Sequence, residues 1–302
     1  MHQDSIDIVL KLKKTRSIKC LVAALLCFIL VNAEVQTVNA QGNYESKQTQ
    51  ISKFVSIVNQ HPGQAGYWSI GKTVLGNNIW MFFFGNTYGR RILVEAQTHG
   101  SEDLGTEMMI LTAKWLFSSD PDAKYVLKNC AVYMVPVLNV DSYGRRNAHG
   151  VDLYYNYPKD WGWSGDGSSS RYSEEYRGPY ALSEPESKAM HQTFVQYGSR
   201  FKYYLSIHQG GGPYLGYYRY ISSAAISGLM SKISQISSSR GVTPYSYKTV
   251  GDPGSVIRDA YSQGIQPWLL EANSGSHYRP DSSTIPSYYR RALPILIAMA
   301  YA

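Results

Sequence analysis

The sequence is poor in cysteine, which limits how the chain can be stabilised. It contains three cysteines in 302 residues, and two of them, Cys20 and Cys27, lie in an apolar N-terminal segment. Without that segment only Cys130 remains, so no internal disulfide can form, and stability has to come from packing or from a bound metal. Cys130 begins an apolar run, and this position favours a buried, unreactive thiol over a catalytic nucleophile.

The sequence also has no basic run, no internal repeat and no long apolar run. Lys and Arg outnumber Asp and Glu by 29 to 22, a mild excess that is spread along the chain and does not indicate nucleic-acid binding. The apolar run 21–31 is too short for a comfortable membrane span. The composition, 44% hydrophobic and 17% charged, is typical of a globular protein with one sizeable core.

The N-terminal residues have the order expected of an export signal. Five basic residues precede the apolar run 21–31, and small residues follow it at Ala33 and Ala40. This order predicts a secretory signal peptide over residues 1–40, cleaved after one of these alanines. We therefore expect a secreted chain with no membrane span in its mature form. The alternative is an uncleaved signal that anchors the chain to a membrane, because the region before the apolar run is long.

The rest of the chain alternates between strand-like and helix-like segments. Runs rich in aromatic and β-branched residues predict strands, and apolar residues at helical spacing predict helices. The predicted strands are 67–75, 79–84, 91–96, 131–138, 202–208 and 267–272. The predicted helices are 51–59, 102–116, 183–197, 222–239 and 283–301. This alternation indicates an α/β layer fold. Residues 41–50 are predicted to be a polar, loose segment, and residues 51–302 one catalytic domain.

Two segments of the predicted domain lack a clear periodicity. Residues 139–180 are rich in Gly, Ser, Tyr and Trp, and a long loop inside a compact domain is usually functional. Residues 245–261 are predicted to be irregular or partly helical. Ser183 and Glu186 have the spacing of a capping box, which predicts the start of the helix that follows them.

Polar residues stand at predicted strand ends, where apolar packing alone would not place them. His99 and Glu102 follow the strand 91–96, and His208 ends the strand 202–208. Two imidazoles and one carboxylate are the ligand set of a catalytic Zn²⁺ that keeps a fourth position for water. These residues also have a structural interpretation. His99 and Glu102 can be a chance pair at a helix start, and His208 can be a histidine whose hydrogen bonds are satisfied at the end of the sheet.

Glu271 is an acid in a predicted buried strand, directly after the apolar residues 268–270. A carboxylate is unfavourable to bury without a partner, which makes Glu271 a candidate general base. The alternative is that Glu271 forms half of a structural ion pair.

Taken in order, these motifs resemble the zinc carboxypeptidases of the carboxypeptidase A family. The resemblance runs from about Phe54 to the C-terminus. The matching segments are 71–74, 99–102, 136–141, 145–153, 183–186, 206–208, 254–255, 261–265 and 270–271. A joint match in the correct order is far more specific than any single motif. It implies a single α/β domain with a mixed, mostly parallel twisted sheet of about eight strands, covered by helices on both faces.

The resemblance also implies roles for individual residues. One Zn²⁺ per chain would be bound by His99, Glu102 and His208, and Glu271 would activate the attacking water. Asp152 would orient a ligand histidine, as carboxylates often do for metal-bound imidazoles.

Further implied roles concern the substrate. Arg145 would polarise the carbonyl group of the scissile bond, with Arg146 as the alternative if the motif is shifted by one residue. Tyr247 would cover bound substrate, with Tyr245 as its competitor.

One departure from the family pattern concerns the substrate. Members that remove C-terminal residues hold the terminal carboxylate with an Asn-Arg pair, but this chain has Tyr154 and Tyr155 there. A neutral phenol cannot provide the charged, bidentate grip of a guanidinium. Three other arginines are available to replace it: Arg258, Arg279 and Arg219. Arg258 would favour an acidic group on the substrate; alternatively, it is a loop residue paired with Asp259.

Three functions follow from these patterns. We favour a secreted zinc metallopeptidase that acts at or near the C-terminus of peptides. The second is a zinc amidohydrolase that cleaves a peptidoglycan stem peptide or another non-standard amide, which the pair Tyr154 and Tyr155 suggests. The third is a non-catalytic peptide- or glycan-binding module. The expected partner is a peptide or muropeptide, and the sequence does not indicate an oligomeric state.

Overall fold

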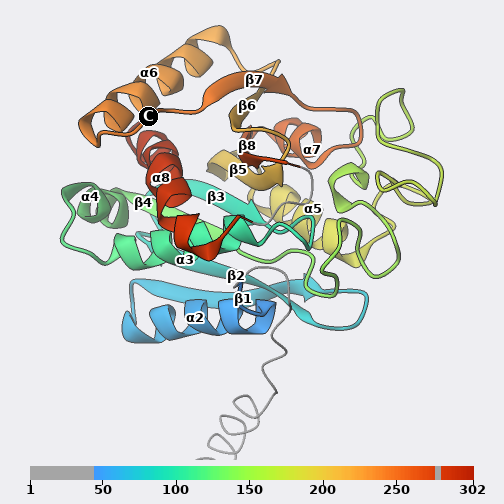
Figure 1. Cartoon of the computed structure of the whole chain (residues 1–302), viewed down its shortest axis with the longest axis horizontal. Helices are drawn as coiled ribbons and strands as arrows, with labels where there is room; N and C mark the ends of the chain where they lie inside the picture. The colour runs from blue at the N-terminus through green and yellow to red at the C-terminus, as the bar shows by residue number, and fades with distance from the viewer. Residues whose placement is uncertain (1–43, 276–279) are drawn as a thin grey trace, which may run out of the picture. The chain divides into compact units, whose positions relative to one another are not determined.

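A computed structural model of the chain describes residues 44–275 and 280–302 (Figure 1). The predicted signal peptide, residues 1–40, and Arg279 lie outside the described residues. Across the described ranges, no helix has the length and apolar character needed to cross a membrane.

Eight strands form one sheet in the order β1-β2-β4-β3-β5-β8-β6-β7. The strands are β1 (Ala65–Lys72), β2 (Asn78–Gly85), β3 (Arg90–Ala96), β4 (Cys130–Val135), β5 (Phe201–Gly210), β6 (Tyr214–Tyr218), β7 (Ser246–Val250) and β8 (Gln266–Ser274). Neighbouring strands are parallel from β4 through β3 and β5 to β8, and β6 is parallel to β7. The pairs β1–β2, β2–β4 and β6–β8 are antiparallel. The predicted mixed, mostly parallel sheet is confirmed.

Helices cover both faces of this sheet (Figure 1). They are α2 (Lys47–Gln60), α3 (Asp103–Leu116), α4 (Pro121–Asn129), α5 (Pro185–Tyr197), α6 (Ser223–Ser239), α7 (Val256–Ser262) and α8 (Ile285–Tyr301). Short 3₁₀ turns are η1 (Leu153–Tyr155), η2 (Gly198–Arg200) and η3 (Ser282–Thr284).

Two successive residues of β5 show how the two faces are covered. Leu205 faces a small apolar space that is also lined by Met108 of α3 and Leu296 of α8. The ring of Tyr204 contacts the ring of Phe194 in α5, with 5.1 Å between the centroids. Because successive side chains of a strand point to opposite faces, α3 and α8 lie on one face and α5 on the other.

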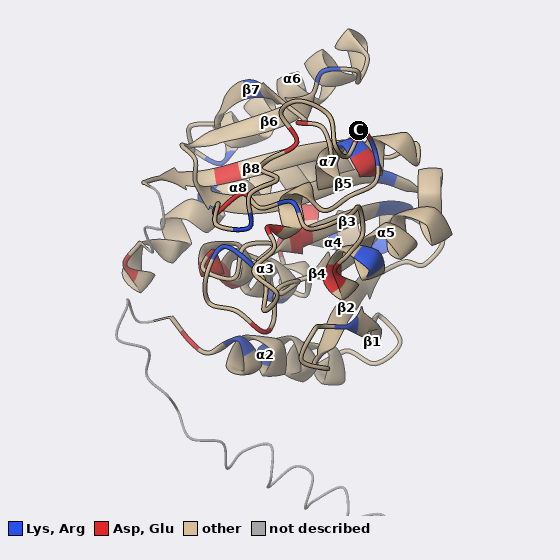
Figure 2. Cartoon of the chain, turned by 90° about the vertical axis from the view of Figure 1, so that its right-hand side faces the viewer, with Lys and Arg blue, Asp and Glu red and all other residues tan. Residues whose placement is uncertain are grey.

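The central strands are continuous apolar runs because they lie in the core, where both faces of the sheet are covered. All six residues of β4 are buried, and the last five of β3 are buried as well. Cys130 begins β4 and is buried, and burial raises the pKa of its thiol to about 11, so the thiol stays protonated at neutral pH. The prediction of an unreactive buried thiol agrees with this position. Figure 2 shows acidic and basic residues interspersed along the ribbon.

Several local predictions are wrong. The predicted loose segment 41–50 contributes its last four residues to α2, in which Lys47 and Gln50 are buried. The segment 245–261 is partly helical through α7, as predicted, but it also contains the strand β7, which was not predicted. Neither β6 nor α4 was predicted. Short strands with few β-branched residues carry little periodicity, and their pairing partners decide their conformation.

The predicted capping box at the start of α5 is also wrong. The N-cap residue of α5 is Glu184, which makes no side-chain capping bond. Glu186 instead accepts hydrogen bonds from the backbone N–H of Val74 and from the side-chain amide of Asn147, both at 3.1 Å. Tertiary contacts therefore use the carboxylate that the local pattern assigned to capping.

Candidate active site

The turn between β3 and α3 positions two of the predicted metal ligands. Gln97 begins this turn with a positive φ of 52°. Its side-chain amide donates hydrogen bonds to Thr106 Oγ1 at 2.8 Å and to Asp103 Oδ1 at 3.2 Å, both in α3. These bonds tie the strand end to the first turns of the helix, so that His99 and Glu102 are held at the helix start.

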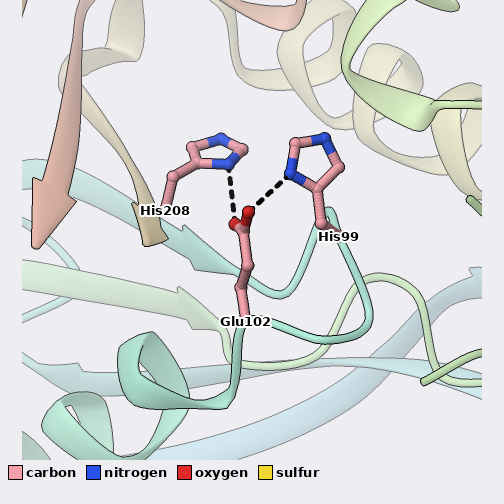
Figure 3. A group of neighbouring side chains, drawn as sticks. All are labelled: His99, Glu102 and His208. Carbon is pink, nitrogen blue, oxygen red and sulfur yellow. Dashed lines mark hydrogen bonds and ion pairs between the residues drawn. The ribbon is translucent and has the colours of Figure 1, made fainter. Parts of the chain in front are cut away.

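His99, Glu102 and His208 come together in one buried cluster (Figure 3). Glu102 Oε1 lies 2.8 Å from His99 Nδ1, and Glu102 Oε2 lies 2.9 Å from His208 Nδ1. The three residues are 9% exposed or less, and their possible ligand atoms all lie within 4.8 Å of one another. The convergence predicted from the strand ends is therefore present.

In each imidazole, Nδ1 faces Glu102 and the outer nitrogen, Nε2, contacts a neighbouring group. His99 Nε2 lies 3.0 Å from Asp152 Oδ1, and His208 Nε2 lies 3.0 Å from the hydroxyl of Ser206. Partners of this kind orient metal-bound imidazoles and leave the inner nitrogen free to coordinate. The role expected of Asp152 as the partner of a ligand histidine agrees with this contact.

The electrostatics of the cluster favour a cation between the three groups. Burial by itself would lower the pKa of His99, but the carboxylates of Glu102 and Asp152 outweigh burial and raise it to about 10. Burial would raise the pKa of Glu102, but His99 and His208 outweigh burial and lower it. The carboxylates of Glu102 and Asp152 thus stabilise a positive charge within the cluster. Together with the two-nitrogen, one-carboxylate donor set, this fits a divalent cation such as Zn²⁺.

Strand pairing places Glu271 beside the cluster. In the sheet, Glu271 of β8 is the Cα partner of His208 on one side and of Tyr214 on the other. The backbone N–H of Gly211 donates a 3.0 Å hydrogen bond to Glu271 Oε2. A Cβ atom on Gly211 would lie 2.7 Å from this carboxylate, so a larger residue at this position would displace the carboxylate. Burial raises the pKa of Glu271.

The cluster and Glu271 open onto a cavity of about 360 Å³. Seventeen residues line it: His99, Ser101, Glu102, Arg145, Tyr154, Tyr155, His208, Gln209, Gly210, Gly211, Tyr214, Lys248, Thr249, Val250, Asp252, Leu269 and Glu271. Its walls come from the ends of β5, β6, β7 and β8 and from the long loop after β4.

The structure separates the two candidate arginines. Arg145 lines the cavity, and its guanidinium contacts Asp152 Oδ2 through Nε and Nη2, both at 2.8 Å. The guanidinium of Arg146 lies in the neighbouring loop, 3.3 Å from Glu174 Oε1, and donates to the carbonyl of Arg171. Arg146 is therefore not placed to act on a substrate in this cavity.

The two tyrosines expected to cover bound substrate both lie away from the cavity in this structure. The hydroxyl of Tyr247 lies 3.4 Å from the carbonyl oxygen of Met230 in α6, and Tyr245 is buried with its hydroxyl near the carbonyl of Ala272. Neither lines the cavity. The three residues that follow Tyr247 line the cavity instead: Lys248, Thr249 and Val250.

Tyr154 and Tyr155 both line the cavity, as their sequence positions suggested. The ring of Tyr154 is nearly perpendicular to the ring of His208, at a centroid distance of 5.6 Å, and to the ring of Tyr155, at 4.9 Å. Arg258 does not replace a missing cation there, because its guanidinium pairs with Asp160. The alternative pairing with Asp259 is also wrong, since Asp259 pairs with His191 at 2.8 Å.

Sequence reasoning missed several residues of this region. Tyr214, Lys248 and Asp252 line the cavity, and β6 and β7, where the first two lie, were not predicted. Lys47 is only 2% exposed, and its ammonium donates hydrogen bonds to the carbonyls of Asn139 and Ser142 in the loop that leads to Arg145. A basic residue in a polar segment gives no sequence signal for such a role.

Comparison with known proteins agrees with this geometry. A family model described as zinc carboxypeptidase matches residues 51–237. Carboxypeptidase A6 of Homo sapiens is 26% identical over 260 residues, covering 78% of this chain and 56% of the human protein. Carboxypeptidase A1 of Rattus norvegicus is 27% identical over 297 residues, covering 85% of this chain and 70% of the rat protein. The chain spans about half the length of the human relative.

A solved structure shows the same fold. Carboxypeptidase A from Helicoverpa armigera superimposes with a TM-score of 0.71 at 20% identity, covering 85% of this chain and 74% of that chain.

Proposed function

The chain belongs to the zinc carboxypeptidase family, and from this premise we propose that it is a zinc metallopeptidase that hydrolyses peptide bonds at or near the C-terminus of its substrate. One observation carries the proposal: His99, Glu102 and His208 meet in a buried cluster with Glu271 beside it, at the wall of a single cavity. This set of groups is what metal-assisted hydrolysis requires.

The cluster would hold one Zn²⁺ through His99 Nδ1, His208 Nδ1 and the carboxylate of Glu102, the atoms that face one another. When bound, Zn²⁺ supplies a nucleophile at neutral pH by lowering the pKa of water from about 15.7 to about 7. Asp152 and Ser206 keep both imidazoles in the orientation that directs Nδ1 inward.

Glu271 acts as the general base in this proposal. Its carboxylate takes a proton from the attacking water and later gives it to the amine that leaves when the C–N bond breaks. The guanidinium of Arg145 stabilises the negative charge that develops on the carbonyl oxygen, and Asp152 holds that guanidinium in place. An oriented donor of this kind is worth about 3 kcal/mol of barrier height.

Hydrolysis and metal content test this function together. We expect one zinc per chain and hydrolysis of blocked dipeptides that ceases on chelation and returns with added zinc. Glu271→Gln should keep the zinc and lose activity by at least about 1000-fold. Glu174→Gln, an exposed glutamate outside the cavity, is the matched control. Full activity of Glu271→Gln would reject the mechanism, and tight peptide binding without turnover by the wild type would indicate a binding module.

The second candidate is an amidohydrolase that cleaves a peptidoglycan stem peptide or another non-standard amide. It is supported by Tyr154 and Tyr155, which stand at the cavity wall where carboxylate-gripping residues are expected. A panel of muropeptides and blocked dipeptides under identical conditions separates the two candidates. Hydrolysis restricted to muropeptides would favour the second.

We further propose that the chain is exported, on the strength of the basic start, short apolar run and following alanines in residues 1–40. Expression of the full chain with its N-terminal segment should yield a product in the medium that begins after Ala33 or Ala40. Mass spectrometry of the N-terminus decides this. A membrane-bound product with the intact N-terminus would indicate an anchor.

A further inference from the structure

We infer that the substrate presents a cationic amine, and not a free carboxylate, to the part of the cavity formed by Tyr154, Tyr155 and Asp252. This inference rests on the proposed function, because it concerns the substrate of the same site. It specifies the chemical class of the group that lies next to the scissile bond.

The two tyrosines are uncharged phenols and cannot supply a positive charge. Burial, with the charge of Asp252 as the next cause, raises the pKa of Tyr155. The hydroxyl of Tyr154 is further engaged by a hydrogen bond with the side chain of Ser255. Each phenol therefore offers a substrate a neutral oxygen, which can accept a hydrogen bond from an ammonium group.

Asp252 lines the same cavity as these tyrosines, and backbone hydrogen bonds position the turn that follows it. It precedes a turn in which the N–H of Gly254 donates to the carbonyl of Lys159 at 2.9 Å. The carbonyl of Gly254 in turn accepts from the N–H of Tyr157, also at 2.9 Å. These bonds join the turn to the segment that carries the two tyrosines. The side chain of Asp252 is exposed, lines the cavity and forms no ion pair with any described residue.

Among the described residues near this region, two arginines are paired with carboxylates. Arg145 is bound to Asp152, and Arg258 to Asp160. The ammonium of Lys248 lies over the ring of Tyr214, 4.9 Å from its centroid. A carboxylate that entered between the tyrosines would be repelled by the negative charge of Asp252, whereas an ammonium would be attracted by it. Lys248 lines the same cavity and is the described cation that would compete by attracting a substrate carboxylate.

Binding to an inactive variant tests the inference without relying on turnover. Three N-acyl dipeptides that differ only at the C-terminus serve as probes: a free carboxylate, a carboxamide and a 2-aminoethylamide, which carries an ammonium group. Calorimetry on zinc-loaded Glu271→Gln should show the 2-aminoethylamide binding about fivefold tighter than the carboxamide, with the carboxylate weakest. Added Asp252→Asn should remove the preference for the amine, and added Glu174→Gln should leave it unchanged.

A gain-of-function variant provides the second measurement. Tyr155→Arg should improve binding of the carboxylate probe by about tenfold, because a guanidinium can grip it through two hydrogen bonds. The inference is overturned if the carboxylate probe binds tightest to the parent protein and Lys248→Met or Arg279→Met removes that preference. Equal affinity for all three probes also overturns it. A preference for the amine without hydrolysis of any probe by the wild type would reject the proposed function and leave this inference intact.

Discussion

Asp152 joins His99 to the arginine of the cavity through its two carboxylate oxygens. Its Oδ1 atom lies 3.0 Å from His99 Nε2, and its Oδ2 atom accepts both hydrogen bonds from Arg145. Asp152 is fully buried, so neither contact competes with water. The orientation of a proposed metal ligand and of the proposed oxyanion donor therefore depends on one carboxylate.

Replacing Asp152 by asparagine should weaken zinc binding. The new side chain keeps an oxygen for His99, but it turns a donor amide toward Arg145 and lacks the charge that stabilises both partners. Removal of such a partner typically costs 10- to 100-fold in metal affinity, so we expect a loss of about that size. Titration against a competing chelator measures it. Asp160→Asn, which removes a different Asp–Arg pair, should not change zinc affinity, and an unchanged affinity in Asp152→Asn would contradict the role.

Lys47→Met should loosen the loop that leads to Arg145. The variant keeps the aliphatic stem but leaves the carbonyls of Asn139 and Ser142 without the ammonium. We expect the free energy of unfolding to fall by about 2 kcal/mol and kcat/KM by about tenfold, because Arg145 is less well placed. Denaturant unfolding and steady-state kinetics measure the two effects. Lys53→Met on the same helix, where the lysine pairs with Glu45 near the surface, should change stability by less than about 0.5 kcal/mol.

Gly211→Ala should impair catalysis without preventing metal binding. The new methyl group would stand 2.7 Å from the Glu271 carboxylate, so the general base has to move. A displaced catalytic group costs on the order of 100-fold in kcat. Gly228→Ala in α6 is the control, because a Cβ there meets nothing within 4 Å, and it should raise stability by up to about 1 kcal/mol. Equal kcat for wild type and Gly211→Ala would show that the close approach is not needed.

The pH dependence of kcat/KM should report the ionisation of Glu271. Burial raises its pKa, above the ordinary value of about 4.3 for glutamate. Only the ionised carboxylate accepts a proton, so kcat/KM is expected to fall as the pH decreases through this raised pKa and to level off above it. Rates measured from pH 4 to 8 locate the acid limb. A limb at or below the ordinary glutamate pKa would argue against Glu271 as the base.

Metal removal should destabilise the fold. A cation that binds only the native state adds about 4 kcal/mol when its concentration is 1000 times Kd. We therefore expect a lower Tm with a chelator and its recovery with added zinc. His208→Ala should abolish the zinc-dependent shift in Tm. His149→Ala, an exposed histidine that contacts Glu184, should retain it, and a zinc-dependent shift that survives in His208→Ala would place the metal elsewhere.

The sequence predicted the residues of the metal cluster because strand ends and short motifs carry that information. His99 and Glu102 share one turn, and His208 and Glu271 each end or interrupt an apolar strand, so each stands out locally. Parallel pairing of β3, β5 and β8 then brings them to the same edge. The choice between Arg145 and Arg146 was not available locally, because adjacent residues in a loop have no periodicity that tells which one faces the cavity.

By itself, the sequence determined the alternation of most strands and helices, the proposed zinc ligands, the candidate base and the absence of a carboxylate-gripping arginine at positions 154 and 155. These follow from residue types and from spacings along the chain. Only the tertiary structure decided that Tyr247 faces α6 while Lys248 faces the cavity, that Arg258 pairs with Asp160, and that Lys47 supports a distant loop. The physical reason is that such contacts depend on which strands pair and in which register, and a shift of one residue reverses the face of every side chain.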